Sequence, residues 1–156
     1  MKIANTNLTF ERLQEKHIHE LEEMFTQFNP GDERDENYEH NPQQVKQFLT
    51  EPQNIAFVAK LGSKVIGCIF GYALTMIDET EKEFFIYGAD IHPDHHNNGH
   101  GTAFMKFVLH WAKENGFRES YVMTGSENIA ACRCYEKAGM EQDDWKTARS
   151  YTAVHG

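Results

Sequence analysis

A short loop with two glycines is the part of the chain whose residue types point most directly to chemistry. The run His96-Asn97-Asn98-Gly99-His100-Gly101 follows an apolar segment ending at Ile91 and precedes an amphipathic segment beginning at Thr102. Glycines at a helix entry let several backbone N–H groups converge on one anion, because no Cβ blocks the approach. The partial positive charge of a helix N-terminus favours phosphate there. We therefore expect Ile91 and the residues His96 to Thr102 to bind a phosphate-bearing cofactor.

A Gly-x-Gly pair on its own also fits a plain flexible helix cap, so the surrounding sequence has to discriminate. A Walker loop needs Gly-Lys-Ser/Thr, and Gly101-Thr102 has no lysine in place. A dinucleotide-binding fold needs its glycines near the first strand, with an acidic residue about twenty positions later. Here the glycines follow a late strand. Neither type of phosphate loop fits.

Two carboxylates, Glu83 and Asp90, bracket the apolar segment before this loop and are candidates for a general base. Positions 83 and 90 differ by an odd number, so regular strand alternation places them on opposite faces unless a bulge intervenes. With regular geometry only one of them reaches the reacting atoms. The alternative is that both are ordinary solvated groups at strand ends.

Histidines and cysteines are the remaining candidates for metal or nucleophilic chemistry. His92, His95, His96 and His100 cluster around the loop, but their spacing is not that of a closed structural metal site and no cysteine lies nearby. We expect no metal. Cys132 and Cys134 lie two residues apart in a predicted helix, where cysteines usually pack inertly. Together with Cys68 they are expected to be reduced.

Size and charge limit the class of protein. The 156 residues, 40% hydrophobic and 25% charged, fit one soluble domain spanning residues 1–156. A net charge of −9 argues against nucleic-acid binding and suits a neutral or cationic substrate. Residues 1–10 do not resemble a signal peptide, and the longest apolar stretch, Val65 to Leu74, is too short to span a membrane. We expect a cytoplasmic protein that does not bind membranes.

Periodicity and turn residues predict the elements that position these groups. An acidic loop, Asp32 to Glu36, separates the first two helices and either faces a polycationic substrate or is an ordinary solvated surface loop. The run Phe84 to Tyr87 predicts a strand in the middle of the sheet. The result is an α/β domain whose first half is largely antiparallel. A first strand is expected to end near Arg12, further strands are expected at 55–61, 65–74, 83–91 and 120–124, and one or two more at 145–154. Helices are expected at 16–28, 102–115 and 128–138, and a short one is expected to begin at residue 42.

Two blocks of the sequence resemble the GNAT acetyltransferase superfamily. The loop 96–101 is similar to the Gln/Arg-x-x-Gly-x-Gly/Ala signature at the start of that superfamily's third helix. Residues 128–140, which include Asn128, Tyr135 and Gly139, are similar to its later Asn…Ala…Tyr-x-Lys-x-Gly-Phe block. Residues 83–87, 94–95 and 99–103 look most like the class I aminoglycoside 3-N-acetyltransferases. The resemblance implies the GNAT fold, a mixed and mostly antiparallel sheet flanked by about four helices.

The resemblance also implies a function. It suggests acetyl-CoA as co-substrate and direct attack on the thioester by a primary amine, either an aminoglycoside or a similar cationic small molecule. Tyr135 would protonate the departing thiolate, and Asn128 would orient the coenzyme or the tyrosine unless it is a plain N-cap. A homodimer through the C-terminal strands follows from the resemblance alone. The alternatives are an acetyl-CoA-binding sensor without catalysis, or an acetyltransferase for polyamines or protein N-termini.

The chain departs from the superfamily pattern at several positions. His96 stands where Gln or Arg is preferred, Asn97 and Asn98 replace residues that are often basic, and His100 replaces an aliphatic residue. We expect weaker cofactor binding than in relatives with arginines there, or help from His96 or His100. Gly88 occupies the place where the aminoglycoside enzymes usually have an aspartate.

Overall fold

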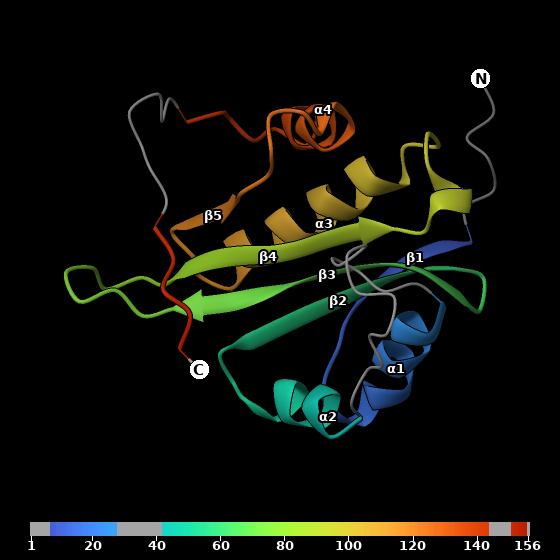
Figure 1. Ribbon diagram of the computed structural model, residues 1–156, viewed down its shortest axis with the longest axis horizontal. Helices are drawn as coiled ribbons and strands as arrows, with labels where there is room; N and C mark the ends of the chain where they lie inside the picture. The colour runs from blue at the N-terminus through green and yellow to red at the C-terminus, as the bar shows by residue number, and fades with distance from the viewer. Residues whose placement is uncertain (1–6, 28–41, 144–150, 156) are drawn as a thin grey trace.

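The computed structural model describes residues 7–27, 42–143 and 151–155 (Figure 1). Short 3-10 turns lie at Glu15–His17 and Pro93–His95. The elements agree with the sequence-based expectations to within a few residues at each end. They are β1 (Leu8–Arg12), α1 (Ile18–Gln27), α2 (Pro42–Thr50), β2 (Asn54–Leu61), β3 (Lys64–Leu74), β4 (Glu83–Ile91), α3 (His100–Glu114), β5 (Glu119–Val122) and α4 (Ile129–Lys137).

The strands form one sheet in the order β1-β2-β3-β4-β5. The first three pairings are antiparallel and join strands that are consecutive in the chain. The last pairing, of β4 with β5, is parallel because α3 carries the chain back across the sheet between them. The mixed, mostly antiparallel sheet with four flanking helices is therefore confirmed.

Two hydrophobic cores lie on opposite faces of this sheet, with α3 and α4 on one side and α1 and α2 on the other (Figure 1). The core under α3 is centred on rings such as Phe57, Phe84 and Phe104, which are almost fully buried. The core under α1 and α2 contains Val58 and Cys68 from the sheet. Both faces of the central strands are thus anchored, which fixes the end of β4 where the glycine loop begins.

A β-bulge interrupts β4. Phe70 of β3 pairs with Gly88, and the next residue of β3, Gly71, pairs with Ile86, so Tyr87 is the extra residue. An extra residue resets the alternation of side chains along a strand. Beyond the bulge, Asp90 lies opposite Cys68, which belongs to the core beneath α1 and α2. The bulge is the exception that the alternation argument allowed, and it removes the expectation that Glu83 and Asp90 face opposite sides.

β4 is an inner strand of the sheet, as the sequence predicted, with β3 on one side and β5 on the other. It pairs with β3 along its length but with β5 only from Glu83 to Ile86. Among the described strands, none continues the pairing on that side from Tyr87 to Ile91. The backbone at the end of β4 therefore has a free edge beside α3 and α4.

Two sequence expectations concern residues that lie wholly or partly outside the described ranges. The expected C-terminal strand is absent from residues 151–155, which are irregular, so that part of the prediction is wrong; residues 145–150 lie outside the described residues. The acidic loop Asp32 to Glu36 also lies outside them. Within the described ranges, no helix has the length and apolar character needed to cross a membrane.

Candidate functional site

The glycine loop enters α3 through a residue in the left-handed conformation. Gly99 is the N-cap, with a φ of 76°, which a glycine adopts without the Cβ penalty of other residues. Having no side chain, it cannot accept hydrogen bonds from the first-turn N–H groups of His100 and Gly101. Its carbonyl accepts a bond from Ala103 N at 3.1 Å, which begins the regular helix. The first-turn donors are therefore available to an anion.

Space beside these donors is open. A Cβ built on Gly99 would meet no atom within 4 Å. A Cβ built on Gly101 would lie 3.5 Å from Cys134 Sγ and 3.7 Å from Ile91 Cγ1, which are ordinary contacts. Packing within the protein therefore does not require glycine at position 101. The two glycines instead leave room for a ligand to approach the backbone.

An exposed histidine of the loop bonds to the end of β4. His96 Nε2 lies 2.6 Å from the carbonyl oxygen of Ile91, so this nitrogen donates and carries the proton. The bond ties the loop to the end of β4. Burial, with the nearby charges of Lys64, His92 and His100, lowers the pKa of His95, which favours its neutral form. No group of three or more His, Cys, Asp or Glu side chains within the described part of the chain could hold a metal ion.

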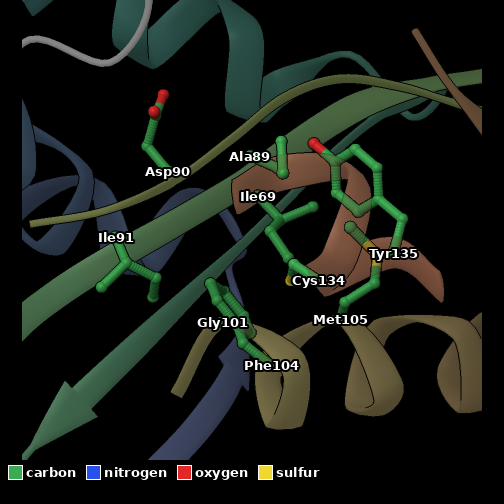
Figure 2. A pocket seen from close by; sticks show the side chains of 10 residues that line it. Ile69, Ala89, Asp90, Ile91, Gly101, Phe104, Met105, Cys134 and Tyr135 are labelled. Atoms are coloured by element: carbon green, nitrogen blue, oxygen red, sulfur yellow. The ribbon is translucent and has the colours of Figure 1, made fainter. Parts of the chain in front are cut away.

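A small pocket of about 80 Å³ lies next to the loop, between the end of β4 and the helices α3 and α4 (Figure 2). Four residues expected from the sequence to belong to the site come together there, namely Asp90, Ile91, Gly101 and Tyr135. Cys134, which the sequence offered only as a rival nucleophile, also lines the pocket. The remaining five had not been predicted, although the 3- and 4-residue spacing from Gly101 is typical of one helical face. They are Ile69, Ala89, Phe104, Met105 and Ala131.

Tyr135 supplies a polar group to a pocket with mostly apolar walls. Its hydroxyl is directed toward Ala89 of β4 (Figure 2). Burial raises the pKa of Tyr135 to about 12, with smaller contributions from Cys134, Asp90 and Cys132. Burial also raises the pKa of Cys134, whose thiol is hydrogen-bonded to the side chain of Thr102. Both groups are therefore protonated at neutral pH, and the phenol is a proton donor.

The two candidate carboxylates have different surroundings. The side chain of Asp90 points away from Tyr135 (Figure 2), toward the sheet face on which Cys68 lies. Glu83 is about 20 Å further along the same strand, at a rise of about 3.3 Å per residue. Glu83 is 9% exposed, and its carboxylate accepts a hydrogen bond from Arg118, which also donates to Glu79 at 3.2 Å. Only Asp90 belongs to the pocket.

Asn128 and most residues of the glycine loop lie outside the pocket. Asn128 is the N-cap of α4, and its Oδ1 accepts a hydrogen bond from Ala131 N at 3.2 Å, which is the plain N-cap interpretation. Asn97 has a φ of 63° and, like Asn98, is exposed. His96, Asn97, Asn98 and Gly99 precede α3, and His100 and Thr102 lie in its first turn. None of these six residues lines the pocket.

Comparisons with known proteins show the family to which the chain belongs. Residues 18–140 match the family described as the acetyltransferase (GNAT) family. N-acetyltransferase 8 of Homo sapiens is 28% identical over 112 residues, which are 70% of this chain and 47% of that protein. The chain thus spans about half the length of the curated relatives it matches.

Two solved structures illustrate the likeness in fold. An aminoglycoside acetyltransferase from an uncultured soil metagenomic sample, in complex with sisomicin, has a TM-score of 0.85 and 19% identity, covering 99% of this chain and 100% of that one. A ribosomal-protein-alanine N-acetyltransferase from Brucella melitensis biovar Abortus 2308 has a TM-score of 0.71 and 16% identity, covering 95% and 99%. At these identities the likeness concerns the fold alone.

Proposed function

Since the chain belongs to the acetyltransferase (GNAT) family, we propose that it transfers the acetyl group of acetyl-CoA to a primary amine by direct attack. Acetyl-CoA is the acetyl donor of this family. The observation that carries the proposal is the open entry to α3 beside a pocket that contains Tyr135. An anion-binding helix start next to a buried proton donor is what a phosphate-bearing thioester requires.

The backbone at the start of α3 is proposed to bind the diphosphate of the coenzyme. The N–H groups of residues 99–102 supply the donors, and the helix dipole favours the negative charge. Since positions 96–100 hold no lysine or arginine, the binding of the diphosphate depends on the main chain more than on permanently charged side chains. When bound, acetyl-CoA supplies a thioester. The free edge of β4 from Tyr87 to Ile91 is where its amide-bearing arm can find backbone partners.

Transfer then needs two proton movements. The amine nitrogen forms a bond to the thioester carbonyl carbon, the C–S bond breaks, and the products are an amide and free CoA. Tyr135 is proposed to give a proton to the departing sulfur, and the proton lost by the amine passes to Asp90, directly or through water. These groups approach the reacting carbon from opposite faces of β4, which suits an acid and a base that act on different atoms. Glu83, held by Arg118 at the other end of the strand, is the less suitable base.

The amine is proposed to be cationic and small. The net charge of −9 raises the local concentration of positively charged ligands. Two neighbouring structures differ in acceptor, since one protein is named for aminoglycosides and the other for a ribosomal protein. Aminoglycosides, polyamines and protein N-termini are the acceptor classes to be compared.

Thiol release and binding together test the proposal. The protein is mixed with acetyl-CoA and a panel of amines containing kanamycin, spermidine, 2-phenylethylamine and a short peptide with a free N-terminus. Production of free CoA that depends on one class of amine is the expected result. Calorimetric titration with acetyl-CoA is the second measurement. Binding without release by any amine would favour a non-catalytic sensor, and absence of binding would overturn the cofactor assignment.

A further inference from the structure

A continuous group of aromatic rings covers the sheet face opposite α3. Each ring centroid lies 4.9 to 6.1 Å from that of at least one other member. The group starts on α2, crosses β3 and β4, and ends on β5. We call it the aromatic face, and its members are Phe48, Phe70, Tyr72, Phe85, Tyr87 and Tyr121.

The bulge in β4 builds the centre of this face. Tyr87, the extra residue, is 65% exposed and contacts rings from both neighbouring positions of β3, Phe70 and Tyr72. The other five rings are partly buried. A ring supported at its edges by other rings keeps its face available to a ligand.

Gly88 and Phe70 keep this face free of other side chains. A Cβ built on Gly88 would lie 2.3 Å from Cε1 and 2.8 Å from Cζ of Phe70. Any side chain at position 88 would therefore require the Phe70 ring to move. The place on β4 next to the bulge is filled by an aromatic ring from β3, so no polar group can stand there.

The aromatic face lies across β4 from the pocket that contains Tyr135. Ala89 and Ile91 line that pocket, while Tyr87 and Gly88, one or two residues earlier, contact the aromatic face. Asp90, opposite Cys68, marks the end of the same face and supplies a negative charge. A molecule resting on the rings would therefore have the end of β4 within reach of its amino group.

We propose that the aromatic face is the acceptor-binding surface and that it selects primary amines with a flat apolar body over polyhydroxylated or linear polycationic amines. This inference rests on the proposed function. Ring faces attract cations and pack well against flat apolar groups. Ring faces themselves offer no partners to the hydroxyls of a sugar-like amine, and the phenol O–H groups of Tyr72, Tyr87 and Tyr121 are the polar groups that the six side chains supply. Most of the hydroxyls of such an amine would therefore lose water without replacing its hydrogen bonds.

A small molecule fits this surface better than a second copy of the chain. A standard protein interface covers roughly 800 Å² on each partner. Here only Tyr87 of the six rings is largely exposed. The exposed area is that of a single ring with partly buried neighbours, which matches an arylalkyl amine in size.

The first experiment compares amines at saturating acetyl-CoA. We expect kcat/KM for 2-phenylethylamine to exceed that for kanamycin and for spermidine by roughly tenfold or more. Kanamycin would leave hydroxyls without hydrogen-bond partners, and spermidine has no flat group to contact the rings. If kcat/KM for kanamycin or spermidine equals or exceeds that for 2-phenylethylamine, the inference is overturned.

The second experiment changes the exposed ring. Tyr87→Leu, which removes the ring but keeps an apolar side chain, should raise KM for 2-phenylethylamine roughly five- to tenfold, while kcat and KM for acetyl-CoA change little. Tyr151→Leu, which makes the same change at an 87% exposed tyrosine outside the aromatic face, is the matched control and should keep the KM of the unaltered protein. Tyr87→Phe keeps the ring and should restore most of the affinity that Tyr87→Leu loses. An unchanged KM for 2-phenylethylamine in Tyr87→Leu would overturn the inference. If light scattering then also showed a change in molecular mass, the aromatic face would be a contact between two copies of the chain.

Direct binding separates this inference from the proposed function. 2-Phenylethylamine is titrated calorimetrically into the protein saturated with CoA, which requires no turnover. Binding that is lost in Tyr87→Leu and kept in Tyr87→Phe supports the aromatic face even if no amine is acetylated, an outcome that would sink only the proposed function. If 2-phenylethylamine does not bind to a protein that acetylates other amines, the proposed function stands and the assignment of flat apolar amines to the aromatic face is wrong.

Discussion

Tyr135 keeps its proton over the whole range in which enzymes commonly work, because burial raises its pKa to about 12. If it protonates the leaving thiolate, Tyr135→Phe should lower kcat by one to two orders of magnitude, roughly the lower range for general acids. The affinity for acetyl-CoA should be unchanged, since the ring remains. Tyr151→Phe, at a tyrosine that is 87% exposed, is the matched control. An unaltered kcat in Tyr135→Phe would remove Tyr135 from the mechanism.

The same shift links Tyr135 to stability at alkaline pH. Its pKa rises from 10.0 to about 12 on folding, so below pH 10 the folded and the unfolded chain both carry the phenol proton. The contribution of Tyr135 to the free energy of unfolding is then fully present. Between these values the unfolded chain releases the proton first, so the free energy of unfolding falls as pH rises. Urea titrations at pH 10 and 12 should show a smaller fall in Tyr135→Phe than in the unaltered protein. Equal falls would contradict the raised pKa.

The two carboxylates of β4 can be told apart by matched amide substitutions. Asp90→Asn should lower kcat at neutral pH by roughly tenfold or more, because the proposed base is lost. Glu83→Gln should keep kcat within about twofold of the unaltered value. It should instead lower the midpoint of thermal unfolding, because it removes the carboxylate that Arg118 bonds. If Glu83→Gln loses turnover and Asp90→Asn does not, the roles are reversed.

At the scale of elements, the entry to α3 is tested by two glycines with the same backbone conformation. Gly99 and Gly62 have φ values of 76° and 63°, and a Cβ on either meets no atom within 4 Å. Gly99→Val and Gly62→Val should therefore each lose about 1–2 kcal/mol of stability. Only Gly99→Val should lose acetyl-CoA binding in a calorimetric titration, because its side chain would obstruct the amides. Retained affinity in Gly99→Val would exclude the loop as the diphosphate site.

The elements themselves were accessible from the sequence because their signals are local. The apolar run from Phe84 to Ile86 and the helical spacing from Phe104 to Trp111 each lie within one segment, and glycines mark the turns between them. The loop at Gly99 and the position of Tyr135 also came from local motifs. These signals suffice for the order of the strands and helices and for the parts of the site on α3 and α4.

The bulge at Tyr87 and the aromatic face were not accessible in the same way. The bulge depends on how Phe70 packs against Gly88 on a neighbouring strand, which is a matter of register. The sequence pattern therefore allowed for a bulge without locating it. The aromatic face gathers rings from four elements, so only the paired sheet brings them together. The role of Arg118 in holding Glu83 is long-range for the same reason.

At the scale of the whole molecule, the net charge of −9 has opposite consequences for the two ligands. A negative protein attracts a protonated amine over distances of about a Debye length, roughly 30 Å at 0.01 M salt and 8 Å at 0.15 M. It repels acetyl-CoA, which is anionic and relies on the local field of α3. Added salt screens both effects, and their signs differ.

The rate constants kcat/KM for the two substrates should therefore respond differently to sodium chloride. Between about 10 and 150 mM, kcat/KM for 2-phenylethylamine should fall several-fold as attraction is screened, while kcat/KM for acetyl-CoA should stay level or rise. Potassium glutamate at the same ionic strength is the control for a specific effect of chloride. A parallel fall for both substrates would show that salt acts on the protein's conformation. In that case the overall charge would have no part in selecting the amine, and the choice would lie with the residues on the sheet.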